Sequence, residues 1–278
     1  MALTYRELPN GWSVASVNRR ETDYLYQEIF LDQTYQMGRE LTTEQPVIFD
    51  VGANIGLFSL YAADRWPDSQ IFAFEPAPAV YEALEENLRA LKNISLFRVA
   101  LGEQTEGREF SFYPGYTMMS GFDADPDADR ALVRSFIENK ATHIAEPARR
   151  AVLVDSATRL LEGKFKQQKF PVRVQRLADV ATVHGVDRID LLKVDVEGAE
   201  LEVLRGVGEA LWPNIDQVVV EVSDREGRLM TISELLTRHG MDIEIRQAPE
   251  YEGTELFMVF AWRSRKERAR TDSVPMGR

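Results

Sequence analysis

The sequence predicts an α/β fold of the doubly wound, Rossmann-like type, built on a mostly parallel sheet of seven strands. From residue 47 onward, short apolar runs alternate with segments of helical spacing. The runs are apolar on both faces, as in parallel strands that helices cover on both sides. The first run, VIFDV at 47–51, leads directly into a glycine-containing turn and a helix. This succession is typical of open sheets that bind ligands at the carboxyl ends of their strands.

The elements of this core follow one another along the chain. The seven strands are expected at 47–51, 70–76, 94–101, 190–196, 217–223, 242–247 and 254–262. Helices are expected at 57–66, 79–93, 199–212 and 231–239, where apolar residues recur at helical spacing. The last two strands are close in sequence, so we expect one of them to run antiparallel at the edge.

Two further segments flank the core, which is expected to span residues 47–263. Residues 1–46 are expected to form a hairpin and a helix at about 24–38, which either packs on the core or acts as a lid over a ligand. Residues 264–278 form a basic, polar tail, which we interpret as a solvated tail or a linker.

Residues 107–175 interrupt the core as a long insertion. They begin with the strand-like stretch REFSFYP and contain a predicted helix near 127–140. The segment is too long for a simple connection, and insertions of this kind at strand ends often cover active sites. We therefore expect this segment to lie over the active site.

Composition excludes several classes of function. The chain has 278 residues and no cysteine, which excludes disulfides, thiolate zinc sites and cysteine nucleophiles. It has no apolar run of about 18 residues and no signal-peptide pattern, so we expect no membrane association and a cytoplasmic location. The net charge of −12 disfavours a nucleic-acid partner.

The stretch DVGANIG, Asp50–Gly56, is the most informative motif. It follows a buried strand and opens a helix, where glycine allows close approach of a ligand and the helix supplies free N–H groups. Gly52 and Gly56 lie four residues apart, whereas the outer glycines of a dinucleotide motif lie five apart. The shorter turn suits S-adenosylmethionine (SAM), which has no pyrophosphate. Asn54, at the middle position, tolerates left-handed backbone geometry.

The ends of the next two strands complete a predicted cofactor site. Glu75, followed by Pro76, can accept hydrogen bonds from both ribose hydroxyls, and Ala100 offers a small surface to an adenine ring. The predicted SAM-binding residues are Asp50, Gly52, Ala53, Asn54, Gly56, Glu75, Pro76 and Ala100. A NAD-linked reductase remains an alternative, which the four-residue glycine spacing disfavours.

Four stretches resemble the FkbM family of SAM-dependent methyltransferases. They are VIFDVGANIG (47–56), AFEP (73–76), VALG (99–102) and LLKVDVEGAE (191–200). The resemblance covers roughly residues 47–240 and implies a class I methyltransferase fold and transfer of a methyl group to a hydroxyl. Residues 21–30 and 118–130 are similar to family members embedded in polyketide or non-ribosomal peptide synthases. That similarity implies a small-molecule hydroxyl substrate, free or presented by an acyl carrier protein, with sugars and other metabolites as alternatives.

The segment KVDVEGAE, 193–200, places charges at the carboxyl end of a core strand, where doubly wound folds bind ligands. Strand alternation puts Lys193, Asp195 and Glu197 on one side while the chain stays extended. Charges on an otherwise apolar strand are costly unless they are paired or functional. We therefore expect these three residues to serve catalysis, with helix capping as the alternative role of Glu197.

The next core strand ends at Glu221, so Asp195 and Glu221 are expected at one rim of the sheet. Two oxygen ligands there can hold Mg²⁺ or another divalent metal, which would lower the pKa of an acceptor hydroxyl. The competing mechanism is metal-free base catalysis by Asp195 or by a histidine, of which His143 in the insertion is the candidate. A non-catalytic docking module with a degenerate methyltransferase fold is the alternative from another functional class.

Overall fold

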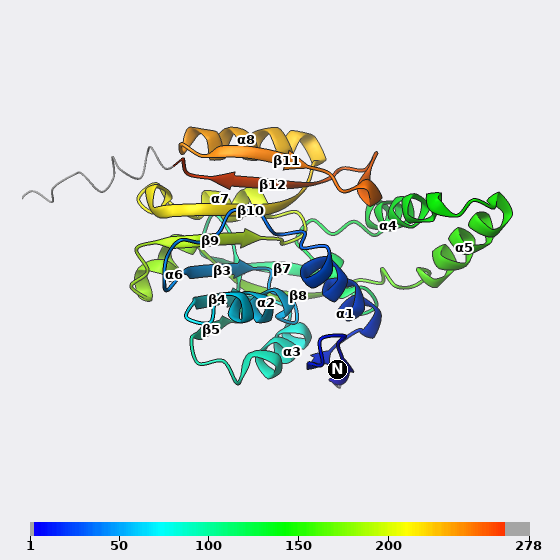
Figure 1. The fold of residues 1–278 in the computed structure, drawn as a ribbon, viewed down its shortest axis with the longest axis horizontal. Coiled ribbons are helices and arrows are strands. Elements are labelled where there is room, and N and C mark those ends of the chain that lie inside the picture. Colours follow the sequence, from blue (N-terminus) through cyan, green and yellow to red (C-terminus); the bar gives the residue numbers. More distant parts are fainter. Residues whose placement is uncertain (1–2, 265–278) are drawn as a thin grey trace, which may run out of the picture.

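The computed structural model describes residues 3–264, and its core is a seven-stranded sheet in the order β11-β12-β10-β9-β3-β4-β5 (Figure 1). The strands are β3 (Val47–Val51), β4 (Gln70–Phe74), β5 (Ile94–Phe97), β9 (Ile189–Val194), β10 (Ile215–Ser223), β11 (Asp242–Arg246) and β12 (Leu256–Trp262). Strand β12 is antiparallel to both of its neighbours, whereas β10, β9, β3, β4 and β5 pair in parallel. The predicted fold class is confirmed, and the antiparallel strand lies one place inside the edge.

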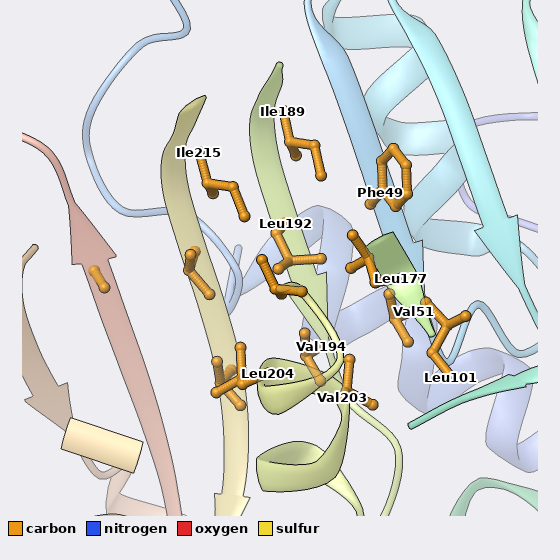
Figure 2. Close-up of a cluster of buried hydrophobic side chains, with 14 of the residues drawn as sticks. Phe49, Val51, Leu101, Leu177, Ile189, Leu192, Val194, Val203, Leu204 and Ile215 are labelled. Atoms are coloured by element: carbon orange, nitrogen blue, oxygen red, sulfur yellow. The ribbon is translucent and has the colours of Figure 1, made fainter. Parts of the chain in front are cut away.

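Helices cover both faces of the sheet, as a doubly wound fold requires. They are α2 (Leu57–Arg65), α3 (Pro78–Leu88), α6 (Leu177–Val183), α7 (Glu200–Arg205) and α8 (Arg228–Arg238). On one face, Phe49 and Leu192 of the sheet pack with Val203 and Leu204 of α7 (Figure 2). The alternate residues of the same strands, such as Ile48, face α2 and the N-terminal segment. The period-two burial of the strands therefore divides the core into two layers.

The predicted helix at 199–212 is wrong in its length. Helix α7 ends at Arg205, and the chain reaches β10 through a 3-10 helix, Trp212–Asn214. Gly206 ends α7 so close to the chain after β6 that a Cβ atom would lie 2.1 Å from the carbonyl oxygen of Gly102. Gly208, with φ of +76°, then turns the chain away from the helical path.

The N-terminal segment begins with an antiparallel hairpin of β1 (Thr4–Glu7) and β2 (Ser13–Ser16). Helix α1 (Arg19–Tyr26) follows and continues as a π-helical turn, Gln27–Leu31. The helix therefore begins and ends earlier than the predicted 24–38. Its start is fixed by Asn18, whose side chain accepts a hydrogen bond from the N–H of Arg20.

The insertion contains a three-stranded sheet and two helices. Strands β6 (Ala100–Leu101), β8 (Gln168–Gln175) and β7 (Glu106–Phe112) form the sheet in that order, so the predicted strand 94–101 is divided between two sheets. The helices are α4 (Pro126–Lys140) and α5 (Pro147–Leu160), which project beyond the sheet at the right of Figure 1.

Short 3-10 helices lie at Thr117–Met119, Ala141–His143, Arg225–Gly227 and Pro249–Tyr251.

Within residues 3–264, none of the helices combines the length and hydropathy of a membrane-spanning segment. The basic tail predicted from residue 264 onward lies, apart from its first residue, outside the described residues.

We expect Gly52→Ala to destabilise the fold strongly. Gly52 has φ of +78°, and a Cβ atom there would lie 1.7 Å from the carbonyl oxygen of Asp195. Gly227 has nearly the same φ, +75°, with no atom within 4 Å of its Cβ position, so Gly227→Ala reports the backbone strain alone. The free energy of unfolding in urea should fall by about 1–2 kcal/mol for Gly227→Ala and by about 2–5 kcal/mol for Gly52→Ala. Equal losses of unfolding free energy in the two variants would contradict the close approach of Gly52 to the carbonyl oxygen of Asp195.

Candidate active site

A large cavity opens at the carboxyl ends of the central parallel strands. It holds about 1360 Å³ of space not occupied by atoms, solvent at its mouth included. The core contributes four stretches to its lining, namely 51–54, 74–77, 99–101 and 195–197. The N-terminal segment and the insertion supply the remaining walls, including Leu25 and Met118. Three separate parts of the chain thus line one cavity at the strand ends.

The turn after β3 presents backbone atoms to this cavity. Gly52 and Asn54 both have left-handed φ values, +78° and +50°, as predicted for Asn54. The side-chain oxygen of Asn54 accepts a hydrogen bond from the N–H of Ile55 at 2.8 Å, which stabilises this conformation. Gly52, Ala53 and Asn54 line the cavity. The turn therefore brings the start of α2 close to any ligand in the cavity.

Glu75, directly after β4, points at the same turn. Its Oε2 accepts the N–H of Asn54 at 3.2 Å, and its Oε1 accepts the N–H of Ala77 at 2.8 Å. Burial raises the pKa of Glu75 to about 7, although both hydrogen bonds act to lower it. Pro76 and Ala100 line the cavity beside it. Six of the eight predicted cofactor residues thus surround one part of the cavity.

Asp50 and Gly56 are the other two, and neither is among the described residues that line the cavity. Asp50 is fully buried and accepts a hydrogen bond from the hydroxyl of Ser59 at 2.7 Å. It lies in the sheet layer beneath the turn because strand alternation turns its side chain away from the cavity. Gly56 begins α2 at φ of +89°, where a Cβ atom would lie 2.8 Å from Leu84. Both residues support the turn from behind.

Lys193 forms the floor of the cavity. Its Nζ lies 3.3 Å from Asp50 Oδ1 and 3.4 Å from Asp195 Oδ2, and it donates a hydrogen bond to the carbonyl oxygen of Gly52 at 2.8 Å. Burial alone would lower the pKa of Lys193, but the two carboxylates outweigh it and raise the pKa above the ordinary value. The ammonium is therefore charged and joins β3, β9 and the turn between β3 and α2.

Asp195, Glu197 and Glu221 converge above this floor. Each offers a carboxylate oxygen, and these three atoms lie within 4.8 Å of one another. The chain leaves the extended conformation after β9, and Glu197 has φ of +54°, so strand alternation does not place it. Burial, followed by the charge of Asp195, raises the pKa of Glu197 and of Glu221 well above ordinary values. The predicted pair of Asp195 and Glu221 thus gains Glu197 as a third member.

The N-terminal segment adds two residues that sequence reasoning missed. Tyr35 donates a hydrogen bond to Asp195 Oδ2 at 2.9 Å. Glu28, on the π-helical turn after α1, also lines the cavity. Burial together with the charge of Asp195 raises the pKa of Glu28 to about 8. π-Helical turns occur often at functional sites. The sequence pattern gave no signal for either residue, because their contacts join segments far apart in the chain.

The far part of the cavity is largely apolar and aromatic. Its lining includes Tyr24, Tyr116, Met118, Met119, Phe122, Leu132, Val133, Phe136, Tyr251 and Leu256. The hydroxyls of Tyr24 and Tyr251 lie 2.7 Å apart, which joins the N-terminal segment to the loop before β12. The insertion therefore supplies part of the cavity lining, and its expected position over an acceptor stays a prediction.

The predicted role of His143 stays a prediction. Its backbone ends the 3-10 helix between α4 and α5, and its side chain lies outside the described residues. His184 contacts Phe97 edge-to-face, and His239 stacks on Trp212 with ring centroids 4.5 Å apart. None of the described residues that line the cavity is a histidine.

Comparison with known proteins gives consistent matches. Residues 50–257 match the model of the methyltransferase FkbM domain. The chain is 40% identical over 261 residues to the 31-O-demethyl-FK506 methyltransferase FkbM of Streptomyces tacrolimicus, covering 92% of this chain and 96% of that protein. It is 37% identical over 265 residues to the AMB antimetabolite synthetase AmbE of Pseudomonas aeruginosa, covering 92% of this chain but only 12% of the synthetase.

A solved structure shares the fold. The methyltransferase FkbM of Methylobacillus flagellatus KT superposes with a TM-score of 0.51 at 15% identity, over 84% of this chain and 47% of that chain.

The stability of the protein should depend on pH through Glu75. Its pKa rises from the ordinary 4.5 to about 7, so between these values the folded state holds a proton that the unfolded state has released. The resulting stabilisation is complete below about pH 4.5 and is lost as the pH rises through 7. In urea denaturation, the free energy of unfolding of the wild type should fall between pH 5 and pH 8. This fall should exceed that of Glu75→Gln by on the order of 2–3 kcal/mol. If the difference in unfolding free energy between the wild type and Glu75→Gln did not change with pH, the raised pKa of Glu75 would be contradicted.

Proposed function

This chain belongs to the FkbM family of methyltransferases, and from that premise we propose that it transfers a methyl group from SAM to a hydroxyl of a polyketide or peptide intermediate, either free or bound to a carrier protein. The family membership confirms the resemblance of the four sequence motifs. The observation that carries the proposal is the contact of Glu75 with the Gly52–Asn54 turn, at one end of a cavity whose other end is apolar.

The part of the cavity beside Glu75 suits a sulfonium nucleoside. The carboxylate of Glu75 uses one hydrogen bond on each oxygen, so each oxygen retains a lone pair for a ribose hydroxyl. Five acidic side chains line the cavity, at Glu28, Glu75, Asp195, Glu197 and Glu221, whereas Lys193 is the one cationic side chain among the described lining residues. This balance favours a positively charged ligand over a dinucleotide with its pyrophosphate. SAM bound there supplies the methyl group.

The apolar part of the cavity favours an acceptor with a large hydrocarbon skeleton. A free sugar needs a polar partner for each buried hydroxyl, whereas Leu132, Val133, Phe136 and Leu256 offer none. The relative from Streptomyces tacrolimicus is described as an O-demethyl-FK506 methyltransferase, which supports an oxygen acceptor on a natural product. The match to part of a synthetase supports a carrier-bound intermediate.

The carboxylate cluster is suited to removing the acceptor proton. Lys193 and Tyr35 hold Asp195 from two sides, so its carboxylate is fixed in place before a substrate enters. As the acceptor oxygen gains the methyl group, its proton passes to a carboxylate of this cluster. Asp195 is the proposed base because its carboxylate lines the cavity and is held by Lys193 and Tyr35.

The same three carboxylates fit a hard divalent cation. Three oxygen donors within 4.8 Å of one another match the ligands that Mg²⁺ and Mn²⁺ prefer. The three acids are half-buried, and a bound cation would offset their mutual repulsion. We propose that Asp195, Glu197 and Glu221 hold such an ion. It would supply Lewis-acid stabilisation of the acceptor oxygen, which lowers the pKa of the hydroxyl.

Calorimetric titration tests the cofactor. SAM and S-adenosylhomocysteine should bind, NAD should not, and Glu75→Gln should weaken SAM binding by about 10–100-fold, because charged hydrogen bonds are lost. Glu200→Gln is the matched control, since Glu200 is also a buried carboxylate with a pKa raised to about 7 but is not among the described lining residues. Transfer from labelled SAM to a hydroxyl acceptor would exclude a non-catalytic docking module. Absence of SAM binding by the folded protein, or preference for NAD, would overturn the proposal.

Titration with Mn²⁺, followed by electron paramagnetic resonance, tests the cation. Glu221→Gln should weaken Mn²⁺ binding by about tenfold or more, since a carboxylate oxygen is lost from the donor set. Glu28→Gln serves as the control for charge alone, because Glu28 lines the same cavity but lies outside the set of converging oxygens. If Mn²⁺ does not bind, or if a chelator leaves methyl transfer unchanged, catalysis by Asp195 without a metal is the remaining mechanism.

A further inference from the structure

Glu21 lies where the N-terminal segment meets the insertion, and its carboxylate is 5% exposed. Its Oε2 accepts three hydrogen bonds, from the N–H of Thr117 at 2.8 Å, the hydroxyl of Thr117 at 2.6 Å and the N–H of Met118 at 3.2 Å. Its Oε1 accepts a hydrogen bond from the side chain of Asn18. We call this set of contacts the Glu21 clamp.

The clamp fixes a cavity wall that has little support of its own. Thr117–Met119 is one turn of 3-10 helix, and the residue before it, Tyr116, gives it no side-chain cap. The first N–H groups of such a turn have no partner within the turn. Glu21 supplies that partner from a point 96 residues earlier in the chain. Thr117, Met118 and Met119 all line the cavity, so the clamp determines where this wall stands.

The clamp also joins two walls into one unit. Glu21 belongs to α1, and one turn further along, the same helix carries Tyr24 and Leu25 into the cavity. A buried carboxylate is costly unless charged hydrogen bonds compensate for its lost hydration. The carboxylate of Glu21 accepts its hydrogen bonds from Asn18 and from the 117–118 turn, and none of these residues belongs to the carboxylate cluster or to the Gly52–Asn54 turn. Its hydrogen bonds therefore do not involve the residues proposed to bind SAM.

We propose that Glu21 is a positioning residue that determines which acceptors the enzyme accepts, because it holds the Thr117–Met119 wall against α1. This inference rests on the proposed function in one respect, namely that this side of the cavity receives the acceptor. A residue that sets the shape of the acceptor wall changes the KM of the acceptor, whereas the SAM affinity depends on Glu75 and the Gly52–Asn54 turn.

Kinetics with a 3-hydroxyacyl N-acetylcysteamine thioester as the acceptor test this inference. Glu21→Ala should raise the KM of the thioester at least about tenfold, with the dissociation constant of SAM changed less than about twofold. Glu21→Gln should lie between Glu21→Ala and the wild type, since its amide oxygen still accepts hydrogen bonds from Thr117. Asp23→Ala is the matched control, because Asp23 is an exposed acid on the same helix that pairs with Arg6, and it should leave the KM unchanged.

Hydrogen exchange supplies a readout that does not require turnover. In Glu21→Ala the amides of Thr117 and Met118 should exchange at least about tenfold faster, whereas those of Gly52–Asn54 should be unchanged. Thr117→Val, which removes one of the three hydrogen bonds, should give a smaller increase at Met118. The effects of Glu21→Ala and Thr117→Val on KM should not add, since both break the same contact.

Two results would overturn the inference. One is unchanged exchange at 117–118 in a folded Glu21→Ala protein, which would show that the turn does not depend on Glu21. The other is an equal rise of the acceptor KM and of the SAM dissociation constant, which would show general loosening of the fold. Failure of the proposed function is distinguishable, because a protein that does not bind SAM or methylate the thioester would still show the change in exchange.

Discussion

The site depends on one buried ammonium group and its three partners. Lys193 lies between Asp50 and Asp195 and donates a hydrogen bond to the carbonyl oxygen of Gly52. A lysine in this position is costly unless carboxylates compensate for its lost hydration, and a buried Asp50 without Lys193 would be equally costly. Each group therefore requires the other. Because Asp50 is on β3 and Asp195 follows β9, this mutual requirement fixes the glycine turn against Asp195.

The negative charge above Lys193 explains the chemistry that the cavity favours. Glu28, Glu197 and Glu221 have raised pKa values because burial and the charge of Asp195 both disfavour their ionisation. A cation that enters the cavity relieves this repulsion, and a sulfonium or a divalent metal each does so. The apolar lining further from the cluster keeps water away from the reacting groups, which strengthens every charge interaction inside.

Local patterns in the sequence predicted the cofactor side of the cavity, and long-range contacts decided the rest. The Gly52–Asn54 turn and Glu75 were predicted because each follows a buried strand, and neighbouring parallel strands end at the same edge of the sheet. Asp50 was assigned to the ligand because the motif does not say which strand face a residue takes. Glu28 and Tyr35 were missed, since no local pattern reveals a contact such as that of Tyr35 with Asp195, 160 positions later.

The cavity walls come from separate parts of the chain, which has a consequence for how such proteins diverge. Lys193 holds the strand-end turns together, whereas α1 and the insertion contribute side chains without entering the central sheet. Substitutions or length changes in these two segments leave the hydrogen-bond ladder of β3, β4 and β9 intact. A lineage can therefore acquire a new methyl acceptor through drift in two peripheral segments while inheriting its methyl donor unaltered.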